Sequence, residues 1–211
     1  MGSDVTDVLL IGASGLAREI LAAGMTGVIG ILDDDAACHG SMVAGVPVLG
    51  SVASAAGRPE KFLIAIGPGT VRRKVTGTLA AQGISDDRFA TFIAPGARVG
   101  TTSTIGAGSV LLDGVVVTAD AVIGRHVVIM PNCTITHDDV LSDFATLAAG
   151  VSLGGAVRVG AGAYLGMNAS VRQTLEVGAD ATVGMGAVVV DSVPPGQTWA
   201  GTPARQLGVT A

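Results

Sequence analysis

The sequence is poor in basic residues, and this excludes one large class of partners. Its 211 residues include only 12 lysines and arginines against 17 aspartates and glutamates, so the formal net charge is −5. Non-specific binding to nucleic acid needs a basic face. We therefore expect no nucleic-acid partner.

Long hydrophobic runs are also lacking, although the mean hydropathy is positive at +0.61. A spanning helix needs about 18 to 20 consecutive apolar residues, and no run in the sequence reaches that length. Residues 1–4 lack the basic and apolar regions of a secretory signal. The two cysteines, Cys38 and Cys133, lie far apart and cannot form a disulfide framework. These features predict a cytoplasmic protein without membrane insertion.

What the second half of the chain has instead is an aliphatic residue at every sixth position. A period of six fits neither a helix nor a hairpin sheet. It fits a coil of short parallel strands with one inward aliphatic side chain per strand, whose ends need covers. We expect the N-terminal region to cover one end and the C-terminal tail the other. The aliphatic series is Ile93, Val99, Ile105, Leu111, Val117, Ile123, Ile129, Ile135, Leu141, Leu147, Leu153, Val159, Leu165, Val171, Val177, Val183 and Val189.

The first 90 residues do not follow this period. Apolar runs predict strands at residues 8–11, 28–32 and 62–66. Helices are expected after the first and third of these strands, the second one with Thr70 as N-cap and Gly83 as its stop. This order implies a small Rossmann-like α/β domain with a mainly parallel sheet. We predict two domains, residues 1–90 and residues 91–211.

Three strand ends of the first domain carry glycine or acidic residues, at 12–15, 33–34 and 67–69. Ligands of such sheets bind beyond the carboxyl ends of the strands, so these segments should converge on one crevice. The turn 12–15 suits a phosphate because backbone N–H groups at the start of a helix are free to bind it. Asp33, about 20 positions further, suits a ribose or base. The fingerprint G-x-G-x-x-G is missing, so NAD binding is not predicted, and a purely structural glycine turn remains the alternative.

The three histidines lie in different contexts. His39 lies in a polar loop and His126 in a coil between inward positions, and both are expected at the surface. His137 lies where the small residues of the repeat give way to polar ones, and Asp139 takes a slot that elsewhere most often holds alanine, serine or cysteine. A carboxylate neighbour, Asp138 or Asp139, could orient the imidazole and raise its basicity, as a general base requires. The alternative is an exposed histidine beside solvated aspartates.

A cysteine nucleophile and a metal site are weaker hypotheses. Cys133 precedes His137 by four residues, but it falls in the small inward slot of the repeat and should be buried. His126 and His137 are eleven residues apart, whereas equivalent positions on one face of the coil are eighteen apart. We expect no metal, and a metal-dependent β-helix enzyme that combines histidines across subunits remains an alternative.

Several motifs of the chain occur in the same order in one group of proteins. The chain resembles the hexapeptide-repeat acyltransferases, which form a left-handed parallel β-helix. Within them it is similar to the nucleotide-sugar amino-sugar N-acetyltransferases of bacterial glycan synthesis, including the bacillosamine-pathway type, with relatives described as sialic acid O-acetyltransferases. The motifs are the aliphatic register, the segments 8–15, 32–34 and 64–67, the pair His137–Asp138, and the tail segments 193–195 and 201–205.

The resemblance implies a role for each matching residue. His137 is the general base, and Asp138 is the acid that tunes it. Acetyl-CoA is the co-substrate, and it lies between neighbouring β-helices of a homotrimer, near Thr146, Met167 and Met185. The residues that hold the nucleotide of the sugar are Gly12, Ala13, Ser14, Asp33, Asp34 and Gly67.

The expected function is therefore direct transfer of an acetyl group to the amine of a UDP- or dTDP-linked 4-amino-deoxy sugar. O-acetylation of a sugar or sialic acid is one alternative, because it needs the same residues. A non-catalytic nucleotide-sugar-binding scaffold is another, because the chain has Thr146 where relatives often have a second histidine, and Met130 where they often have asparagine.

Overall fold

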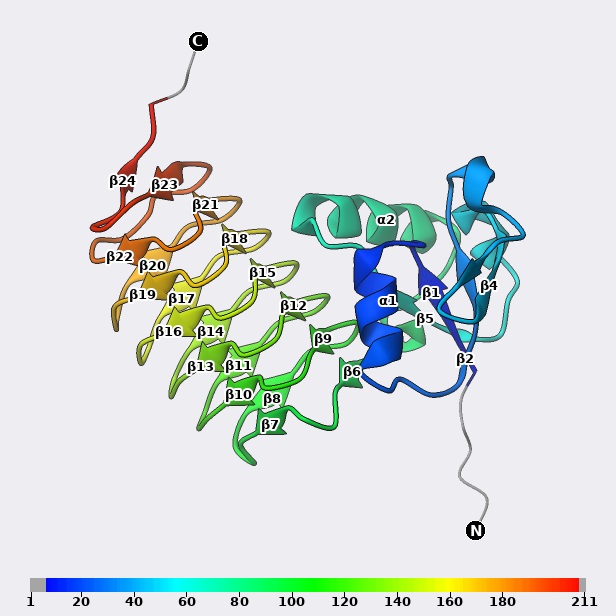
Figure 1. The fold of residues 1–211 in the computed structure, drawn as a ribbon, viewed down its shortest axis with the longest axis horizontal. Coiled ribbons are helices and arrows are strands. Elements are labelled where there is room, and N and C mark those ends of the chain that lie inside the picture. Colours follow the sequence, from blue (N-terminus) through cyan, green and yellow to red (C-terminus); the bar gives the residue numbers. More distant parts are fainter. Residues whose placement is uncertain (1–6, 209–211) are drawn as a thin grey trace.

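The computed structural model describes residues 7–208, so the prediction for residues 1–4 lies outside the described part. It contains an α/β domain that stands beside a long coil of short strands (Figure 1). Within residues 7–208, no helix has the length and apolar character that crossing a membrane requires.

The α/β domain is a five-stranded sheet with helices on both faces. The strand order is β3-β4-β2-β1-β5, and all neighbours are parallel except β3 and β4. Helix α1 packs on one face through Leu16 and Ile20, and α2 packs on the other through Leu79. The bounds are β1 (Val8–Ile11), α1 (Gly15–Ala22), β2 (Val28–Leu32), η1 (Ala36–Cys38), β3 (Met42–Val43), β4 (Val46–Gly50), η2 (Val52–Ala55), β5 (Lys61–Ile64), α2 (Gly69–Ala81) and η3 (Asp86–Arg88).

Two details of this domain differ from the sequence prediction. Strands β3 and β4 were not expected, because β4 contains Pro47 and ends at Gly50, which are residues typical of turns. Thr70 is not the N-cap of α2; the helix begins at Gly69, and Pro68 occupies the cap position without a side-chain hydrogen bond. Gly83 follows the helix closely with a φ of 83°, as expected for a helix stop.

Residues 92–189 form a parallel β-helix whose strands all end at the predicted aliphatic residues. Three strands make one coil, and equivalent strands stack into three sheets. The first sheet contains β6, β9, β12, β15, β18, β21, β23 and β24, the second β7, β10, β13, β16, β19 and β22, and the third β8, β11, β14, β17 and β20. The bounds are β6 (Phe92–Ile93), β7 (Arg98–Val99), β8 (Thr104–Ile105), β9 (Val110–Leu111), β10 (Val116–Val117), β11 (Val122–Ile123), β12 (Val128–Ile129), β13 (Thr134–Ile135), β14 (Val140–Leu141), β15 (Thr146–Leu147), β16 (Ser152–Leu153), β17 (Arg158–Val159), β18 (Tyr164–Leu165), β19 (Ser170–Val171), β20 (Glu176–Val177), β21 (Thr182–Val183), β22 (Val188–Val189), β23 (Thr198–Ala200) and β24 (Arg205–Gln206).

A second period of six appears in the turns between these strands. Every sixth residue from 108 to 186 has a positive φ, between 54° and 76°. Gly, Asn and Asp adopt this left-handed conformation most easily, and they fill most of the positions. The residues are Gly108, Gly114, Asp120, His126, Asn132, Asp138, Phe144, Gly150, Ala156, Gly162, Asn168, Thr174, Asp180 and Gly186. The turns therefore stack into three corners of the coil.

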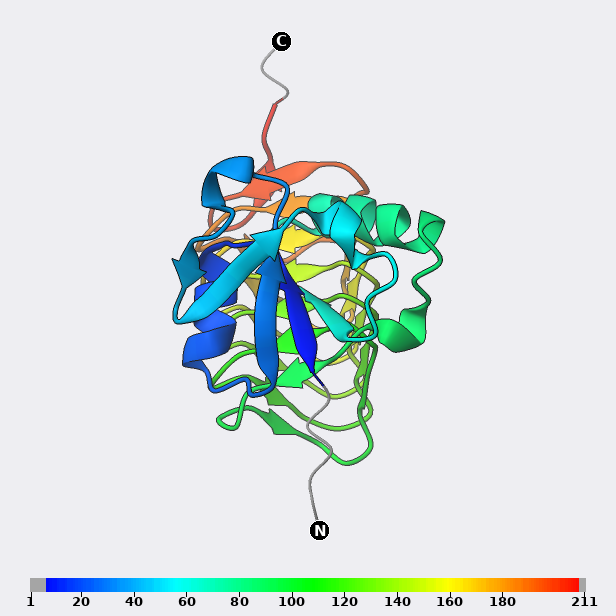
Figure 2. The ribbon, with the colours of Figure 1, turned by 90° about the vertical axis from the view of Figure 1, so that its right-hand side faces the viewer.

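The α/β domain covers a side of the β-helix rather than its end, contrary to the sequence prediction (Figure 2). Val110 and Val128 of the first sheet share a hydrophobic cluster with Leu10 and Leu63 of the domain. The first coil stays partly open, and Ile93 is 42% exposed. At the other end, the tail packs against the core through Trp199 and Ala204.

Candidate active site

His137 lies on a solvent-exposed corner of the β-helix. We call the turns between the second and third sheets, residues 119–120, 137–138, 155–156 and 173–174, the open corner. The His137 side chain is 66% exposed, and its Nδ1 lies 2.7 Å from Oδ2 of Asp138. This hydrogen bond raises the pKa of His137 above its ordinary value, and the charges of Asp138, Asp139 and Asp120 add to the effect. The pair has the geometry of a base and its orienting acid.

The next coil supports the His137 ring. A Cβ atom added to Gly155, which lies eighteen residues further, would come within 2.5 Å of Cε1 and Nε2 of His137. The ring therefore rests against the backbone of Gly155, in space that any other residue would fill. Hydrogen bonding at Nδ1 and this contact together define the direction of the ring.

Asp139 does not bind His137. Its side chain is fully buried, and its two oxygens accept hydrogen bonds from the backbone N–H groups of Thr136 (2.7 Å) and Val157 (2.8 Å). Burial raises its pKa to about 6. Of the two carboxylates considered from the sequence, Asp138 is thus the one that contacts the imidazole.

The prediction for His126 is wrong, because this residue is buried rather than at the surface. The residue is 1% exposed, and its ring stacks on Phe144 at 5.3 Å and meets Phe89 edge-on at 4.6 Å. Burial, and then the charge of Arg72, lower its pKa to about 4. Helix α2 and Phe89 cover this part of the coil. We call the turns 107–108, 125–126, 143–144 and 161–162, between the third and first sheets, the covered corner.

Cys133 is fully buried in the β-helix core, as predicted, whereas His39 lies at the surface in its loop. The Cys133 thiol points to the carbonyl of Ala148 at 3.1 Å, and burial raises its pKa to about 11. A thiol in this state is a poor nucleophile.

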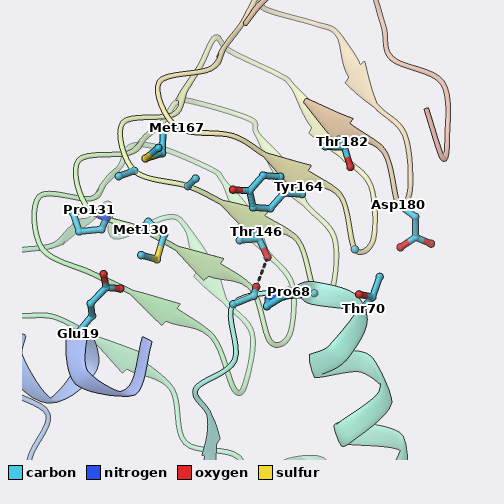
Figure 3. A pocket seen from close by; sticks show the side chains of 15 residues that line it. Glu19, Pro68, Thr70, Met130, Pro131, Thr146, Tyr164, Met167, Asp180 and Thr182 are labelled. Carbon is cyan, nitrogen blue, oxygen red and sulfur yellow. Dashed lines mark hydrogen bonds between the residues drawn. The ribbon is translucent and has the colours of Figure 1, made fainter. Parts of the chain in front are cut away.

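A pocket of about 720 Å³ lies between the α/β domain and the first sheet (Figure 3). Gly67, Thr146 and Met167, three of the residues assigned from the resemblance, line it. Met185 lies outside it and is 72% exposed. The lining residues are Glu19, Gly67, Pro68, Gly69, Thr70, Met130, Pro131, Thr146, Ala148, Ala149, Gly162, Tyr164, Met167, Asp180 and Thr182.

The Thr146 hydroxyl is occupied within the protein. It donates a hydrogen bond to the carbonyl of Gly67 (3.1 Å) and accepts one from Nη2 of Arg72 (3.0 Å). The polar atom of Thr146 thus joins the first sheet to the α/β domain, which leaves mainly its carbon atoms for a ligand.

Arg72 is a buried residue beside the pocket that the sequence analysis missed. It is fully buried, and burial lowers its pKa to about 10. Its guanidinium also donates hydrogen bonds to the carbonyl oxygens of Ile66, Gly67, His126, Phe144 and Ala145. The available signal was its place on the buried face of α2, one and two turns before Val75 and Leu79. Arg72 holds the turn after β5 against the covered corner.

The predicted nucleotide-binding segments contact one another at the ends of the strands. The N–H of Ala13 donates to Oδ2 of Asp33 (2.6 Å), and Ser14 donates to the carbonyl of Ala65 (2.6 Å) while capping α1. Asp34 accepts a hydrogen bond from the N–H of Val52 (2.9 Å). Gly12, Ala13, Ser14, Asp33 and Asp34 do not line the pocket.

His137 and the pocket lie on different sides of the β-helix. The pocket is on the first sheet, and the open corner joins the other two sheets. A single chain therefore does not bring the candidate base to the pocket.

Comparison with known proteins assigns both halves of the chain to described families. Residues 7–79 match the PglD N-terminal domain, and residues 102–137 match the bacterial transferase hexapeptide (six repeats). The acetyltransferase domain of PglB from Neisseria gonorrhoeae FA1090, in complex with acetyl coenzyme A, is 32% identical, with a TM-score of 0.86 over 96% of this chain and 99% of that one. The chain belongs to the hexapeptide-repeat acyltransferases with a left-handed β-helix.

Other solved structures agree with this assignment. A variant of GDP-perosamine N-acetyltransferase from Caulobacter crescentus, with one histidine replaced by alanine, is in complex with CoA and GDP-perosamine. It is 30% identical, with a TM-score of 0.88 over 99% of this chain and 100% of that one. WeeI from Acinetobacter baumannii AYE shares the fold at 24% identity, with a TM-score of 0.68 over 95% of this chain and 99% of that one. A search of curated proteins finds no match. The predicted fold class and the prediction of an acyltransferase are confirmed.

Proposed function

We propose that this acyltransferase moves an acetyl group from acetyl-CoA to the amino group of a nucleotide-linked amino sugar, with His137 as general base. The exposed His137–Asp138 pair carries the proposal. The ligands of the Neisseria and Caulobacter relatives, acetyl coenzyme A in one and CoA with GDP-perosamine in the other, support the substrate classes. The family resemblance of the sequence suggests UDP or dTDP as the nucleotide. The GDP-perosamine bound to the Caulobacter enzyme adds GDP as a third candidate.

The geometry of His137 fits a direct transfer. A carboxylate oxygen of Asp138 accepts a hydrogen bond from Nδ1–H, and in this tautomer of His137 the free lone pair is on Nε2. Nε2 takes a proton from the sugar amine as the nitrogen attacks the thioester carbonyl, and a backbone N–H at a corner stabilises the oxyanion. The protonated His137 then delivers the proton to the CoA sulfur. A neutral amine is already nucleophilic, so the base mainly removes the positive charge that develops on nitrogen.

The pocket fits the substrates of this reaction. Met130, Pro131, Ala148 and Met167 make one side apolar, which suits the pantetheine arm of acetyl-CoA, and the exposed Met185 continues this surface one coil further. The nucleotide binds at Gly12, Ala13, Ser14, Asp33, Asp34 and Gly67, beyond the strand ends of the α/β domain. Gly67 belongs to both regions, so the sugar lies between them.

A homotrimer completes the site. No histidine is among the described lining residues of the pocket of one chain, and His137 lies on another side of the coil. In a closed ring of three subunits, each His137 faces the pocket of a neighbour. The active sites therefore lie between subunits.

Replacement of the base is the first test. We expect His137→Ala to lower kcat by about 10² to 10⁴, because general bases contribute that much. Gln173→Ala, an exposed change at the equivalent position two coils further, serves as the control and should keep the rate. CoA thiol release is measured with UDP-, dTDP- and GDP-linked 4-amino sugars and with sialic acid. A rate for His137→Ala within threefold of wild type contradicts the assignment, release only with the hydroxyl acceptor indicates O-acetylation, and no release with any acceptor indicates a scaffold.

Complementation tests the shared site. Ala149→Trp fills the pocket but keeps His137, whereas His137→Ala keeps the pocket. Each variant alone should be inactive. Co-expression in equal amounts should restore about a quarter of the wild-type activity. A working site needs the open pocket of a His137→Ala subunit and the histidine of an adjacent Ala149→Trp subunit, and random mixing gives this arrangement at about one interface in four. No restored activity in mixed oligomers, or a monomeric mass in solution scattering, contradicts the trimer.

A further inference from the structure

Asp139 occupies the position two residues before an aliphatic of the repeat, a slot that serine fills in other coils. In the coils below it, Ser103 and Ser109 fill the same slot. The Ser109 hydroxyl accepts a hydrogen bond from the N–H of Val127 (3.0 Å), and Ser103 accepts one from Ala121 (3.0 Å). Each partner lies eighteen residues further, so the slot ties one coil to the next. Asp139 does the same through the N–H of Val157.

Burial of a carboxylate in this slot is less favourable in free energy than burial of a hydroxyl. Asp139 is fully buried, and no basic side chain within residues 7–208 forms a salt bridge with it. Burial of a charged group without a cationic partner is unfavourable, as the raised pKa of about 6 also indicates. The coil itself does not need this charge, since uncharged residues, most often alanine, serine or cysteine, fill the slot elsewhere. What aspartate has in this slot and serine lacks is a second oxygen.

That second oxygen binds the residue before His137. Oδ2 of Asp139 accepts the N–H of Thr136 at 2.7 Å, and the Thr136 hydroxyl donates in turn to the carbonyl of Leu153 (3.1 Å). Oδ1 accepts a hydrogen bond from the N–H of Val157. Val157 follows Gly155 by two residues, and the His137 ring rests against Gly155. Asp139 therefore connects the turn that carries the imidazole to the turn that supports it.

We propose that Asp139 is a positioning residue, whose buried carboxylate holds the His137 turn over Gly155 in the direction that proton transfer requires. The inference rests on the proposed role of His137 and adds a residue that never touches the substrate. A displaced base loses rate without loss of substrate binding, because binding depends on other residues. The charged groups that face His137 are Asp138, Asp139 and Asp120, and loss of one of these carboxylates should lower the pKa of His137.

Asp139→Ser tests the proposal, because it keeps the link to Val157 that serine makes elsewhere and loses the link to Thr136. We expect kcat to fall about tenfold or more, with KM for both substrates within about twofold. The acid limb of the kcat/KM profile and the NMR-titrated pKa of His137 should both move down. Ser109→Ala, which removes the link to the next coil at a slot remote from His137, should alter neither. If Asp139→Ser does not fold, Asp139→Asn, which keeps the volume and removes the charge, is measured in the same way.

The outcomes separate this inference from the proposed function. Wild-type kcat and an unchanged His137 pKa in Asp139→Ser, while His137→Ala is inactive, overturn the positioning role and leave the base in place. An active His137→Ala overturns the base. In that case the His137 titration still decides whether Asp139 acts on the imidazole, because NMR does not depend on turnover.

Discussion

The covered and open corners of the β-helix have the same backbone but give their histidines opposite properties. His126 and Asp138 occupy equivalent left-handed positions, with φ values of 54° and 62°. At the covered corner His126 is buried between two aromatic rings and its pKa falls to about 4. At the open corner His137 is exposed, pairs with Asp138, and its pKa rises.

The difference comes from what packs on the repeat rather than from the repeat. The α/β domain lies against one corner through Arg72 and Phe89 and makes that corner part of an interior. It leaves the other corner in solvent, where a titrating side chain can meet a substrate. In a solenoid, whose coils are nearly identical, an added domain thus buries one corner and leaves another corner with the same backbone exposed.

The largest effect should follow from removing Arg72, which holds the covered corner in place. Arg72→Met leaves several buried carbonyl oxygens and the Thr146 hydroxyl without their donor. We expect the free energy of unfolding to fall by about 3 to 5 kcal/mol, measured by urea denaturation at fixed protein concentration. Arg73→Met, which removes an exposed pair with Asp180, should cost less than about 1 kcal/mol. Equal effects of the two variants contradict the role of Arg72.

The next largest effect should be a decrease in the free energy of unfolding at acidic pH, caused by protonation of His126. Its folded pKa of about 4 lies below the ordinary 6.5, so the unfolded chain binds the proton first as the pH falls. Stability should therefore decrease between pH 6.5 and 4, by about 3 kcal/mol in total. Asp139, whose folded pKa of about 6 exceeds its ordinary 3.8, acts in the opposite direction over part of this range.

The difference between wild type and His126→Asn isolates the histidine, because both chains keep Asp139. Asparagine tolerates the left-handed backbone and does not titrate. The free energy of unfolding is measured from pH 7 to pH 4 for both proteins. An identical pH dependence in the two would show that His126 is not held neutral.

The sequence was informative wherever the decisive residues are close in the chain. The six-residue register predicted all the strands from β6 to β22, because each coil is built from its own neighbours. His137 and Asp138 are adjacent, so their pairing could be read from the order of residues. The buried state of Cys133 followed from its slot.

The parts that could not be predicted arise between segments remote in sequence. His126 is buried by Phe89, which lies 37 positions before it, and by helix α2. No local sequence pattern predicts these contacts. The pocket forms where the turn after β5 meets the first sheet, so its lining joins Gly67 to Thr146 across 79 residues. Asp139 was recognised as an exception to the repeat, but its two backbone partners required the structure.

The finest comparison places the same substitution at both corners. Gly108 lies one coil below His126, and an added Cβ would meet Nδ1 of that ring at 2.3 Å. Gly155 lies one coil above His137, and an added Cβ would meet Cε1 and Nε2 of that ring at 2.5 Å. His126 cannot move between its aromatic neighbours, and Gly108 has a φ of 74°, so Gly108→Ala should cost about 1 to 2 kcal/mol of unfolding free energy.

His137 can swing into solvent, and Ala119 shows that the position of Gly155 accepts a Cβ. Gly155→Ala should therefore change stability by less than about 0.5 kcal/mol while lowering kcat about tenfold, because the ring loses its support. Urea denaturation and thiol release are measured on both variants. A stability loss at Gly155 as large as that at Gly108, with kcat unchanged, would mean that the open corner holds its histidine for structure, as the covered corner does.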